Sequence, residues 1–190
     1  PSVEARNAGE LITLAKARPG KLNYGSAGSG TPPHIVMEMF RSATGLDLTH
    51  IPYKGNHFPG LLAGEVQVSF DVPTLFAPQA RIGKIKVLAV ASDKRHPEFP
   101  DVQTLAEAGV PGFTASAWYG LVAPLGTPPA VISRLHLETQ KVLADPDVRA
   151  AFARLHTDPV GNTPAEFAML LASEARRWAQ AVKASGARIE

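Results

Sequence analysis

The chain has 190 residues, of which 45% are hydrophobic and 19% are charged, and its formal net charge is +2. This composition is typical of a protein with a packed core, and no run of lysine or arginine is long enough to indicate a nucleic-acid partner. No apolar stretch reaches the roughly 18 residues of a membrane span, and the first ten residues carry no signal peptide. The absence of cysteine excludes disulfides, thiolate metal sites and a cysteine nucleophile.

The first half of the chain alternates between helix and strand patterns. Helices are expected where apolar residues recur at helical spacing, and strands where short apolar runs end at glycine or proline. The expected order is a helix at 8–17, a strand at 22–25, a helix at 31–42, a strand at 48–52, a helix at 59–63, a strand at 66–70, a helix at 74–82 and a strand at 87–91. This alternation predicts an α/β fold with a mostly parallel sheet and helices on both faces.

After Ser92 the pattern changes. A charged loop at 93–100 and a short helix at 104–108 precede residues 113–122, which are rich in aromatic and β-branched side chains. We predict that 113–122 is a strand that leaves one lobe for another. The rest is expected to be helical, at 128–143, 146–154 and 164–185, and Thr163 with Glu166 has the spacing of a capping box.

The most informative segment is the loop from Ser26 to Thr31, which reads SAGSGT between a predicted strand and a predicted helix. A dinucleotide fingerprint would need a third glycine, but two prolines follow Gly30. A P-loop would need a lysine, and a nucleophile elbow would need glycine two positions before and two positions after the serine. The loop has neither, so it matches none of these three enzyme motifs.

What remains is a donor-rich loop at the start of a helix, an arrangement that binds small anions. Thr31 is the expected N-cap, and Pro32 and Pro33 remove two of the N–H groups that a helix usually offers. The donors are then expected to be the N–H groups of Gly28, Ser29 and Gly30 with the hydroxyls of Ser26 and Thr31. His34, in the first turn, would donate to the loop carbonyls or to a ligand. The alternative is a tight turn that uses glycine for its backbone freedom and binds nothing.

Two further polar segments follow predicted strands. Tyr53, Lys54 and Gly55 form one of them, in which Lys54 would offer charge to an acidic ligand and Tyr53 a hydroxyl or an apolar wall; alternatively, the lysine is only solvated. Asp71 follows the strand at 66–70 and either accepts a hydrogen bond from a ligand or caps the next helix. Ligands of open α/β sheets bind at the carboxyl ends of the strands. Three polar segments on one edge therefore predict a binding site there.

The residues indicate no catalytic or metal site. The six histidines show neither the H-E-x-x-H pattern nor a close pairing with an acid, so no zinc site is predicted. No Ser-His-Asp set or carboxylate pair can be argued from spacing, and no cofactor is expected. The leading hypothesis is a binding protein without catalysis, and the alternative is a small α/β hydrolase or transferase that uses the glycine loop as an anion hole.

Seven separated segments of the sequence carry a family pattern. They read YGSAGSGTPPH, IPYKG, VQVSFD, KVLAVASDKR, PEFPDVQTLAEAGVPG, SAWYGLVAPLGTP and DPVGNTPAEF. In order and in spacing, from about residue 8 to the C-terminus, they resemble the periplasmic solute-binding receptors of tripartite tricarboxylate transporters, which are also called Bug proteins.

The resemblance implies a fold like that of type II periplasmic binding proteins, in which two α/β lobes hold a carboxylate between them. Residues 1–112 would form the second, ligand-binding lobe, and residues 113–190 a crossing strand and the helical part of an incomplete first lobe. The ligand would be a dicarboxylate, an amino acid or an aromatic acid, captured in the periplasm for the membrane subunits of a transporter. The expected ligand-binding residues are Ser26, Gly28, Ser29, Gly30, Thr31, His34, Tyr53, Lys54, Gly55 and Asp71.

The sequence departs from the family pattern in two ways. Family chains begin with an additional segment whose glycine-rich loop supplies the other half of the ligand site, and nothing here matches it. Weak or absent ligand binding is therefore expected, and the strand predicted at 116–122 would be an open edge that invites pairing with a second copy. His57 and Phe58 are bulkier than the small residues expected after the 53–55 loop, which would alter the choice of ligand.

Overall fold

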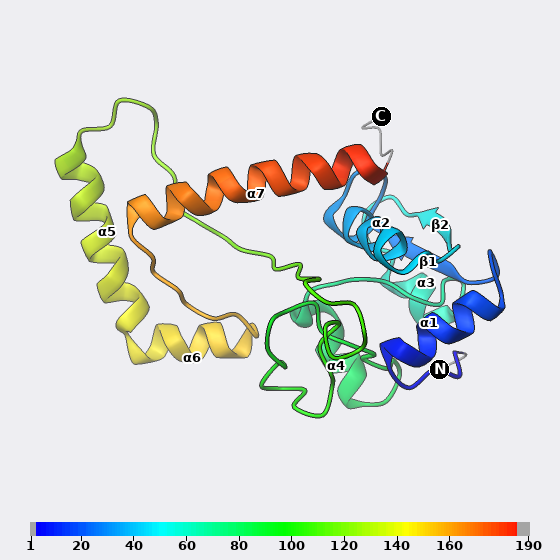
Figure 1. Ribbon diagram of the computed structural model, residues 1–190. Helices are drawn as coiled ribbons and strands as arrows, with labels where there is room; N and C mark the ends of the chain where they lie inside the picture. The colour runs from blue at the N-terminus through cyan, green and yellow to red at the C-terminus, as the bar shows by residue number, and fades with distance from the viewer. Residues whose placement is uncertain (1–2, 186–190) are drawn as a thin grey trace. The chain divides into compact units, whose positions relative to one another are not determined.

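Figure 1 shows the computed structural model, which describes residues 3–185. The helices and strands are α1 (Ala8–Ala17), β1 (Asn23–Ser26), α2 (Pro32–Thr44), β2 (Thr49–Pro52), α3 (Phe58–Ala63), α4 (Pro73–Arg81), α5 (Pro129–Ala144), α6 (Pro146–Arg154) and α7 (Pro164–Ser185). The chain divides into two compact units: unit 1 runs to Ala117 and resumes at Ala179, and unit 2 is Trp118–Trp178. Apart from the short helix at 104–108, every predicted helix is confirmed, with ends no more than two residues from those expected.

β1 and β2 form a two-stranded parallel sheet in unit 1. β2 pairs with β1 along its whole length, so that Ser26 lies opposite Pro52. Beyond the other edge of β1, Val68 forms a parallel bridge with Tyr24, and Gly25 N–H donates to Val68 O at 3.0 Å. Three of the four β1 residues are buried, as expected for a strand with neighbours on both edges. The predicted α/β class with parallel pairing is confirmed.

The strand predicted at 66–70 is wrong as a continuous strand, because a side chain replaces part of the ladder. Asn23 N–H donates to the side-chain oxygen of Gln67 at 2.8 Å, and the side-chain NH₂ of Gln67 donates to Gly64 O at 2.8 Å. The backbone N–H of Gln67 still donates to Asn23 O at 2.8 Å. The segment therefore follows β1 as predicted, but without the regular bonding of a strand.

The strand predicted at 87–91 and the helix predicted at 104–108 are also wrong. The two segments meet in a single parallel bridge between Val90 and Thr104. Residues 104–108 form turns, because the segment completes only one helical hydrogen bond, back to Thr104 O, before Gly109 redirects the chain with a φ of +91°.

The strand predicted at 113–122 is an extended segment without a partner strand in the described chain. One long-range backbone hydrogen bond joins it to the rest of unit 1, from Ala115 N–H to Ala91 O at 2.8 Å. Tyr119, Leu121 and Val122 are 89%, 79% and 80% exposed. Aromatic and β-branched residues favour a strand through packing against neighbouring strands, and here no neighbour supplies that packing.

The core of unit 1 gathers apolar residues of α1 and α2 around β1. Its buried residues include Leu11, Ala15, Tyr24, Ile35, Met37, Phe40, Leu48, Val66, Val68 and Leu105. The Phe40 ring stands edge-on to the rings of Phe70 and Phe113, at centroid distances of 5.7 and 6.0 Å. Burying one large apolar side chain contributes about 1.5–3 kcal/mol, so this cluster fixes α2 against segments that lack regular structure.

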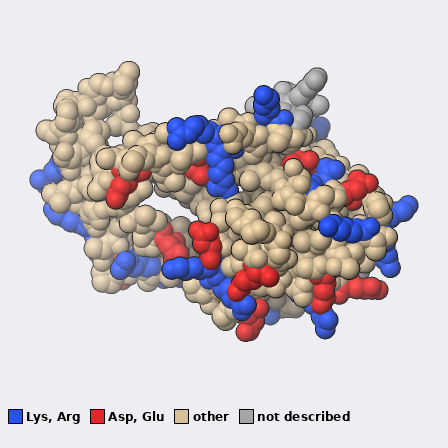
Figure 2. All heavy atoms as spheres, viewed as in Figure 1, with Lys and Arg blue, Asp and Glu red and all other residues tan. Residues whose placement is uncertain are grey.

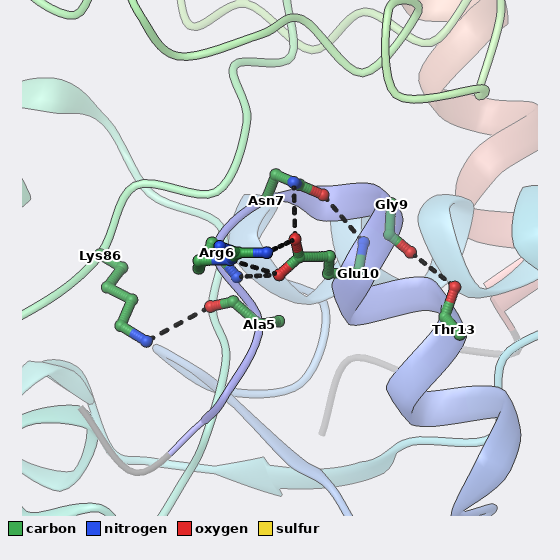
Figure 3. A network of polar contacts seen from close by, with 7 residues as sticks. All are labelled: Ala5, Arg6, Asn7, Gly9, Glu10, Thr13 and Lys86. Atoms are coloured by element: carbon green, nitrogen blue, oxygen red, sulfur yellow. Dashed lines mark hydrogen bonds and ion pairs between the residues drawn. The ribbon is translucent and has the colours of Figure 1, made fainter.

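The start of the chain is tied to the segment around residue 86. Ala8 N–H donates to Leu88 O at 3.0 Å, and Lys86 Nζ donates to Val3 O at 2.8 Å and to Ala5 O at 3.4 Å. Figure 3 shows Lys86 reaching across to Ala5 beside the first turn of α1. These bonds hold the entry to α1 against the rest of unit 1.

Unit 2 contains α5, α6 and most of α7. The ring of Trp118 meets that of Phe167 edge-on at 5.6 Å. The predicted capping box is confirmed: Thr163 N–H donates to Glu166 Oε2 at 2.7 Å, and Glu166 N–H donates to Thr163 Oγ1 at 3.2 Å. α5 and α6 contain no buried residue.

The surface carries both signs of charge. On the face drawn in Figure 2, basic and acidic side chains are interspersed rather than gathered by sign. Among residues 3–185, no helix has the length and apolar character needed to cross a bilayer.

The N-cap of α1 provides a test of the local structure. The Asn7 side-chain oxygen accepts Glu10 N–H at 2.9 Å, as Figure 3 shows. Asn7→Ala is expected to lower the free energy of unfolding by about 1 kcal/mol, measured by urea unfolding followed by circular dichroism. Asn7→Ser keeps an acceptor and should lose much less. Equal losses in the two variants would contradict the capping role.

Candidate functional site

The predicted ligand loops lie side by side because backbone pairing continues past the ends of β1 and β2. Tyr53 N–H donates to Ser26 O at 3.0 Å, and Gly55 N–H donates to Ala27 O at 3.0 Å. The glycine loop and the loop at 53–55 are thereby joined at the carboxyl edge of the sheet. This is the edge at which the sequence predicts a binding site, and we refer to these two loops with Asp71 as the loop edge.

Gly28 is required where the two loops approach most closely. Its φ is +135°, and a Cβ at this position would lie 3.3 Å from Tyr53 O. A residue with a side chain would be strained by the backbone angle and would also crowd the neighbouring carbonyl. The glycine therefore sets the spacing of the two loops.

The glycine loop uses most of its own donors internally. Gly28 N–H donates to Ser26 Oγ at 3.2 Å, and Gly30 N–H donates to His34 Nδ1 at 3.0 Å. The expectation that both amides are available to an anion is therefore corrected. Within the described chain the N–H groups of Ala27 and Ser29 make no hydrogen bond, and Ser29 is the exposed residue of the two, so its amide is the more accessible to a ligand.

Thr31 and His34 also differ from expectation. Thr31 occupies the N-cap position of α2, but its hydroxyl donates to Gly28 O at 2.7 Å and accepts no helical N–H. Pro32 and Pro33 fill the first two helical positions and carry no N–H, so the first N–H that an N-cap side chain could bind belongs to His34. His34 accepts a loop N–H at Nδ1 instead of donating to loop carbonyls.

Three rings stack behind the glycine loop. The centroids of Tyr24 and His50 are 4.6 Å apart, those of His50 and His34 are 4.1 Å apart, and the two histidine planes agree within 3°. His50 Nε2 lies 2.7 Å from Ser26 Oγ. Burial lowers the pKa of His34 and, helped by the neighbouring His34 ring, lowers the pKa of His50 to about 4. Both rings are therefore neutral at pH 7.

At the Tyr24 end of the stack, the tyrosine hydroxyl meets the ion pair of Glu38 and Arg41 on α2. The Tyr24 hydroxyl donates to the Glu38 carboxylate, and Glu38 also accepts from Arg41 at 2.7 Å. Burial and the Glu38 carboxylate raise the pKa of Tyr24 above its usual value. The interior beneath the loop edge is thus polar, and its groups are paired.

Tyr53 and Lys54 have different surroundings. The Tyr53 hydroxyl donates to Glu65 Oε2 at 2.8 Å and lies over Gly60, where any Cβ would collide with it. The expectation that this hydroxyl is offered to a ligand is corrected, because Glu65 occupies it. Lys54 and Gly55 are exposed.

Asp71 pairs with a residue that sequence reasoning did not place in the site. His57 Nε2 lies 2.7 Å from Asp71 Oδ2, and the two side chains are 2% and 12% exposed. The N-cap of α4 is Val72, so Asp71 does not cap that helix. In the sequence, the bulk of His57 was the one feature that pointed to this residue. Its pairing with Asp71 could not be predicted, because Asp71 lies fourteen residues away and the two meet only in the folded chain.

Two hollows of about 220 Å³ are lined by Glu38, Met39, Ser42, Ala43, Ala181, Ala184 and Ser185, and by Gly9, Ile12, Lys16, Ala43, Thr44, Ala108, Gly109 and Val110. Neither includes a predicted ligand residue. Among residues 3–185, no three histidine or acidic side chains are grouped to hold a metal ion. These features define a parallel α/β protein whose polar loops share one sheet edge.

Comparison with known proteins identifies the family. The model of the tripartite tricarboxylate transporter family receptor matches residues 1–187, and the chain belongs to that family. It is 38% identical over 176 residues to the UPF0065 protein in the tcbD-tcbE intergenic region of Pseudomonas sp. (strain P51), covering 91% of this chain and 52% of that protein. The chain thus spans about half the length of this relative.

Solved structures agree. A protein of R. palustris with adipate has a TM-score of 0.85 and 30% identity, covering 98% of this chain and 63% of its own. The periplasmic binding protein BugD has a TM-score of 0.81 and 32% identity, covering 100% and 64%. MatC from Rhodopseudomonas palustris with bound malate has a TM-score of 0.79 and 30% identity, covering 94% and 63%. The hydrolase or transferase alternative finds no support in these comparisons.

Gly28 provides a test of the loop edge. Gly28→Ala is expected to destabilise the protein by about 1–3 kcal/mol, because the backbone angle is strained for alanine and Tyr53 O is close. Gly45 has a φ of +68° with open space around it, so Gly45→Ala should cost only about 1 kcal/mol. Urea unfolding measures both variants. A loss for Gly28→Ala no larger than for Gly45→Ala would show that the loops do not depend on this contact.

Proposed function

We propose that the chain is the ligand-capturing part of a periplasmic solute-binding receptor. It takes a small carboxylated organic solute and delivers it to the membrane subunits of a tripartite tricarboxylate transporter. The observation that carries the proposal is the likeness to two solved proteins that hold adipate and malate, together with the receptor family to which the chain belongs. Both of those ligands are dicarboxylates, so a dicarboxylate is the preferred class, ahead of amino acids and aromatic acids.

At the loop edge, the predicted ligand residues divide into two roles. Ser29 offers an unpaired N–H and Lys54 an exposed ammonium group, and together they suit a ligand carboxylate. Asp71 would repel a carboxylate, so it receives a hydroxyl or ammonium group of the ligand while His57 holds its other oxygen. The remaining residues shape the loops: Ser26, Gly28, Gly30, Thr31, His34, Tyr53 and Gly55.

The lobe assignment remains a proposal. Residues 1–112 form the second lobe and residues 113–190 the crossing segment and part of the first lobe. In a receptor as long as the relatives, the first lobe closes over the loop edge by a hinge motion. Periplasmic capture follows from the likeness to BugD, a periplasmic binding protein.

Ligand binding can be followed on the chain itself. Adipate and malate, titrated into ¹⁵N-labelled protein, are expected to shift the amide signals of Ser29 and of residues 53–55. Lys54→Met should weaken binding about two- to fivefold, the effect of one exposed charge, and more so at low salt. Lys21→Met, at the opposite end of β1, should leave binding unchanged. Shifts confined to other segments, or equal effects of the two lysines, would contradict the site.

Self-association through residues 116–122 is a further part of the proposal. This segment makes no backbone hydrogen bond in the described chain and exposes apolar side chains, which favours pairing with a second copy. Sedimentation should show a mass that rises with concentration, and Leu121→Lys should abolish the rise. Val160→Lys is the matched control, since Val160 is equally exposed at 79% in unit 2. A concentration-independent monomer would rule out the dimer.

A further inference from the structure

Two histidines behind the glycine loop each hold one point of it. His34 Nδ1 accepts Gly30 N–H at 3.0 Å. His50 Nε2 lies 2.7 Å from Ser26 Oγ, and that same hydroxyl oxygen accepts Gly28 N–H at 3.2 Å. The Gly30 amide is therefore held directly by an imidazole ring, and the Gly28 amide is held by a hydroxyl that also donates to Gly28 O at 3.1 Å and contacts His50.

Only a neutral ring can keep the bond to Gly30. A ring nitrogen accepts an N–H while it is unprotonated, and an imidazolium carries hydrogen on both nitrogens. A proton on His34 Nδ1 would face Gly30 N–H, and the bond would be lost. Because the two rings stack at 4.1 Å, a proton on one also disfavours a proton on the other.

The charged groups around His34 and His50 do not offset the effect of burial on the pKa values of the two rings. The groups that face the two rings are Tyr24 from β1 and Glu38 and Arg41 from α2. Glu38 favours a proton on either ring, but it is paired with Arg41 at 2.7 Å, which opposes that proton, and it also accepts the Tyr24 hydroxyl. Burial lowers the pKa of both histidines. The neutral rings are therefore favoured near pH 7, and the first proton enters only below the ordinary histidine pKa of about 6.5.

We infer that His34 is a positioning residue that holds the glycine loop in its ligand-receiving shape as a neutral ring, with His50 stacked against it, and that protonation of His34 in acid releases the loop and its ligand. The release of ligand rests on the function proposed above, whereas the release of the loop does not require a ligand. In acid, Gly30 N–H loses its acceptor, and Ser29, which precedes it, loses its fixed position.

The loop can be followed in the full chain without ligand. NMR titration of ¹⁵N-labelled histidine reports the protonation of each ring, and amide hydrogen exchange reports the protection of Gly30. Nδ1 of His34 is expected to be unprotonated at pH 7. Because burial lowers the folded-state pKa of His34, the protected loop is lost as the pH falls from the ordinary histidine pKa of about 6.5 towards the folded-state pKa. Over that range the protection factor of Gly30 should drop by up to about tenfold per pH unit, and it should level off below the folded-state pKa.

Two substitutions of His34 distinguish the role of its hydrogen-bond acceptor from the role of its stacked ring. His34→Asn supplies an oxygen that can accept Gly30 N–H and gains no proton, whereas His34→Phe keeps a ring in the stack without an acceptor. Adipate affinity should fall in acid for the unsubstituted chain and for the control His136→Asn, on α5. The fall should be smaller for His34→Asn, in which only the ligand's own carboxyl groups and other side chains respond to acid, and adipate affinity should be about tenfold weaker at pH 7 for His34→Phe, the equivalent of one lost hydrogen bond.

Two results would overturn the inference. One is a Gly30 protection factor that is the same at pH 7 and pH 4.5. The other is a pH dependence of adipate binding in His34→Asn that matches the unsubstituted chain. If neither adipate nor malate binds at any pH, the proposed function fails, and the exchange data alone decide the inference about the loop.

Discussion

The loop edge depends on the pairing of two chain segments beyond the ends of their strands. β1 and β2 end at Ser26 and Pro52, yet the next two backbone hydrogen bonds form as if the strands continued. Two backbones at this distance leave little room for a side chain between them, and Gly28 has no side chain. It also adopts a positive φ that residues with a side chain rarely adopt. The positions of Ser29 and Lys54 follow, because each belongs to one of the paired loops.

The polar interior under these loops is a consequence of the same pairing. Backbone groups of the glycine loop turn inward, and buried polar groups are costly unless they are paired. Imidazole rings and the Ser26 hydroxyl supply the partners. The Tyr24 ring stacks on His50, and its hydroxyl donates to Glu38. An apolar filling could pack against β1 equally well, but it would leave Gly30 N–H without an acceptor. The histidines therefore serve the shape of the loop as well as the core.

The helices could be predicted from the sequence because their signals are local. α6 begins at Pro146 after Asp145, whose carboxylate oxygen accepts the N–H groups of Asp147 and Val148 at 2.9 and 3.1 Å. The strands were harder to predict from the sequence, because a strand forms only when it pairs with another segment, and the local sequence does not specify that segment. Residues 113–122 have a strand composition and no partner in the described chain, and at 66–70 the amide of Gln67 takes over bonds that a backbone would make.

The same distinction applies to the loop edge. Its location was predictable, since parallel strands bring their carboxyl ends to one side of a sheet. Its donors were not, because an anion site made of amides consists of those left unpaired once the fold has formed. His34 accepts from the Gly30 amide and Ser26 accepts from the Gly28 amide, so the exposed donors that we place against a carboxylate are the Ser29 amide and Lys54. Two such groups, screened by salt, bind a carboxylate weakly, and tight capture therefore requires further donors from outside the loop edge.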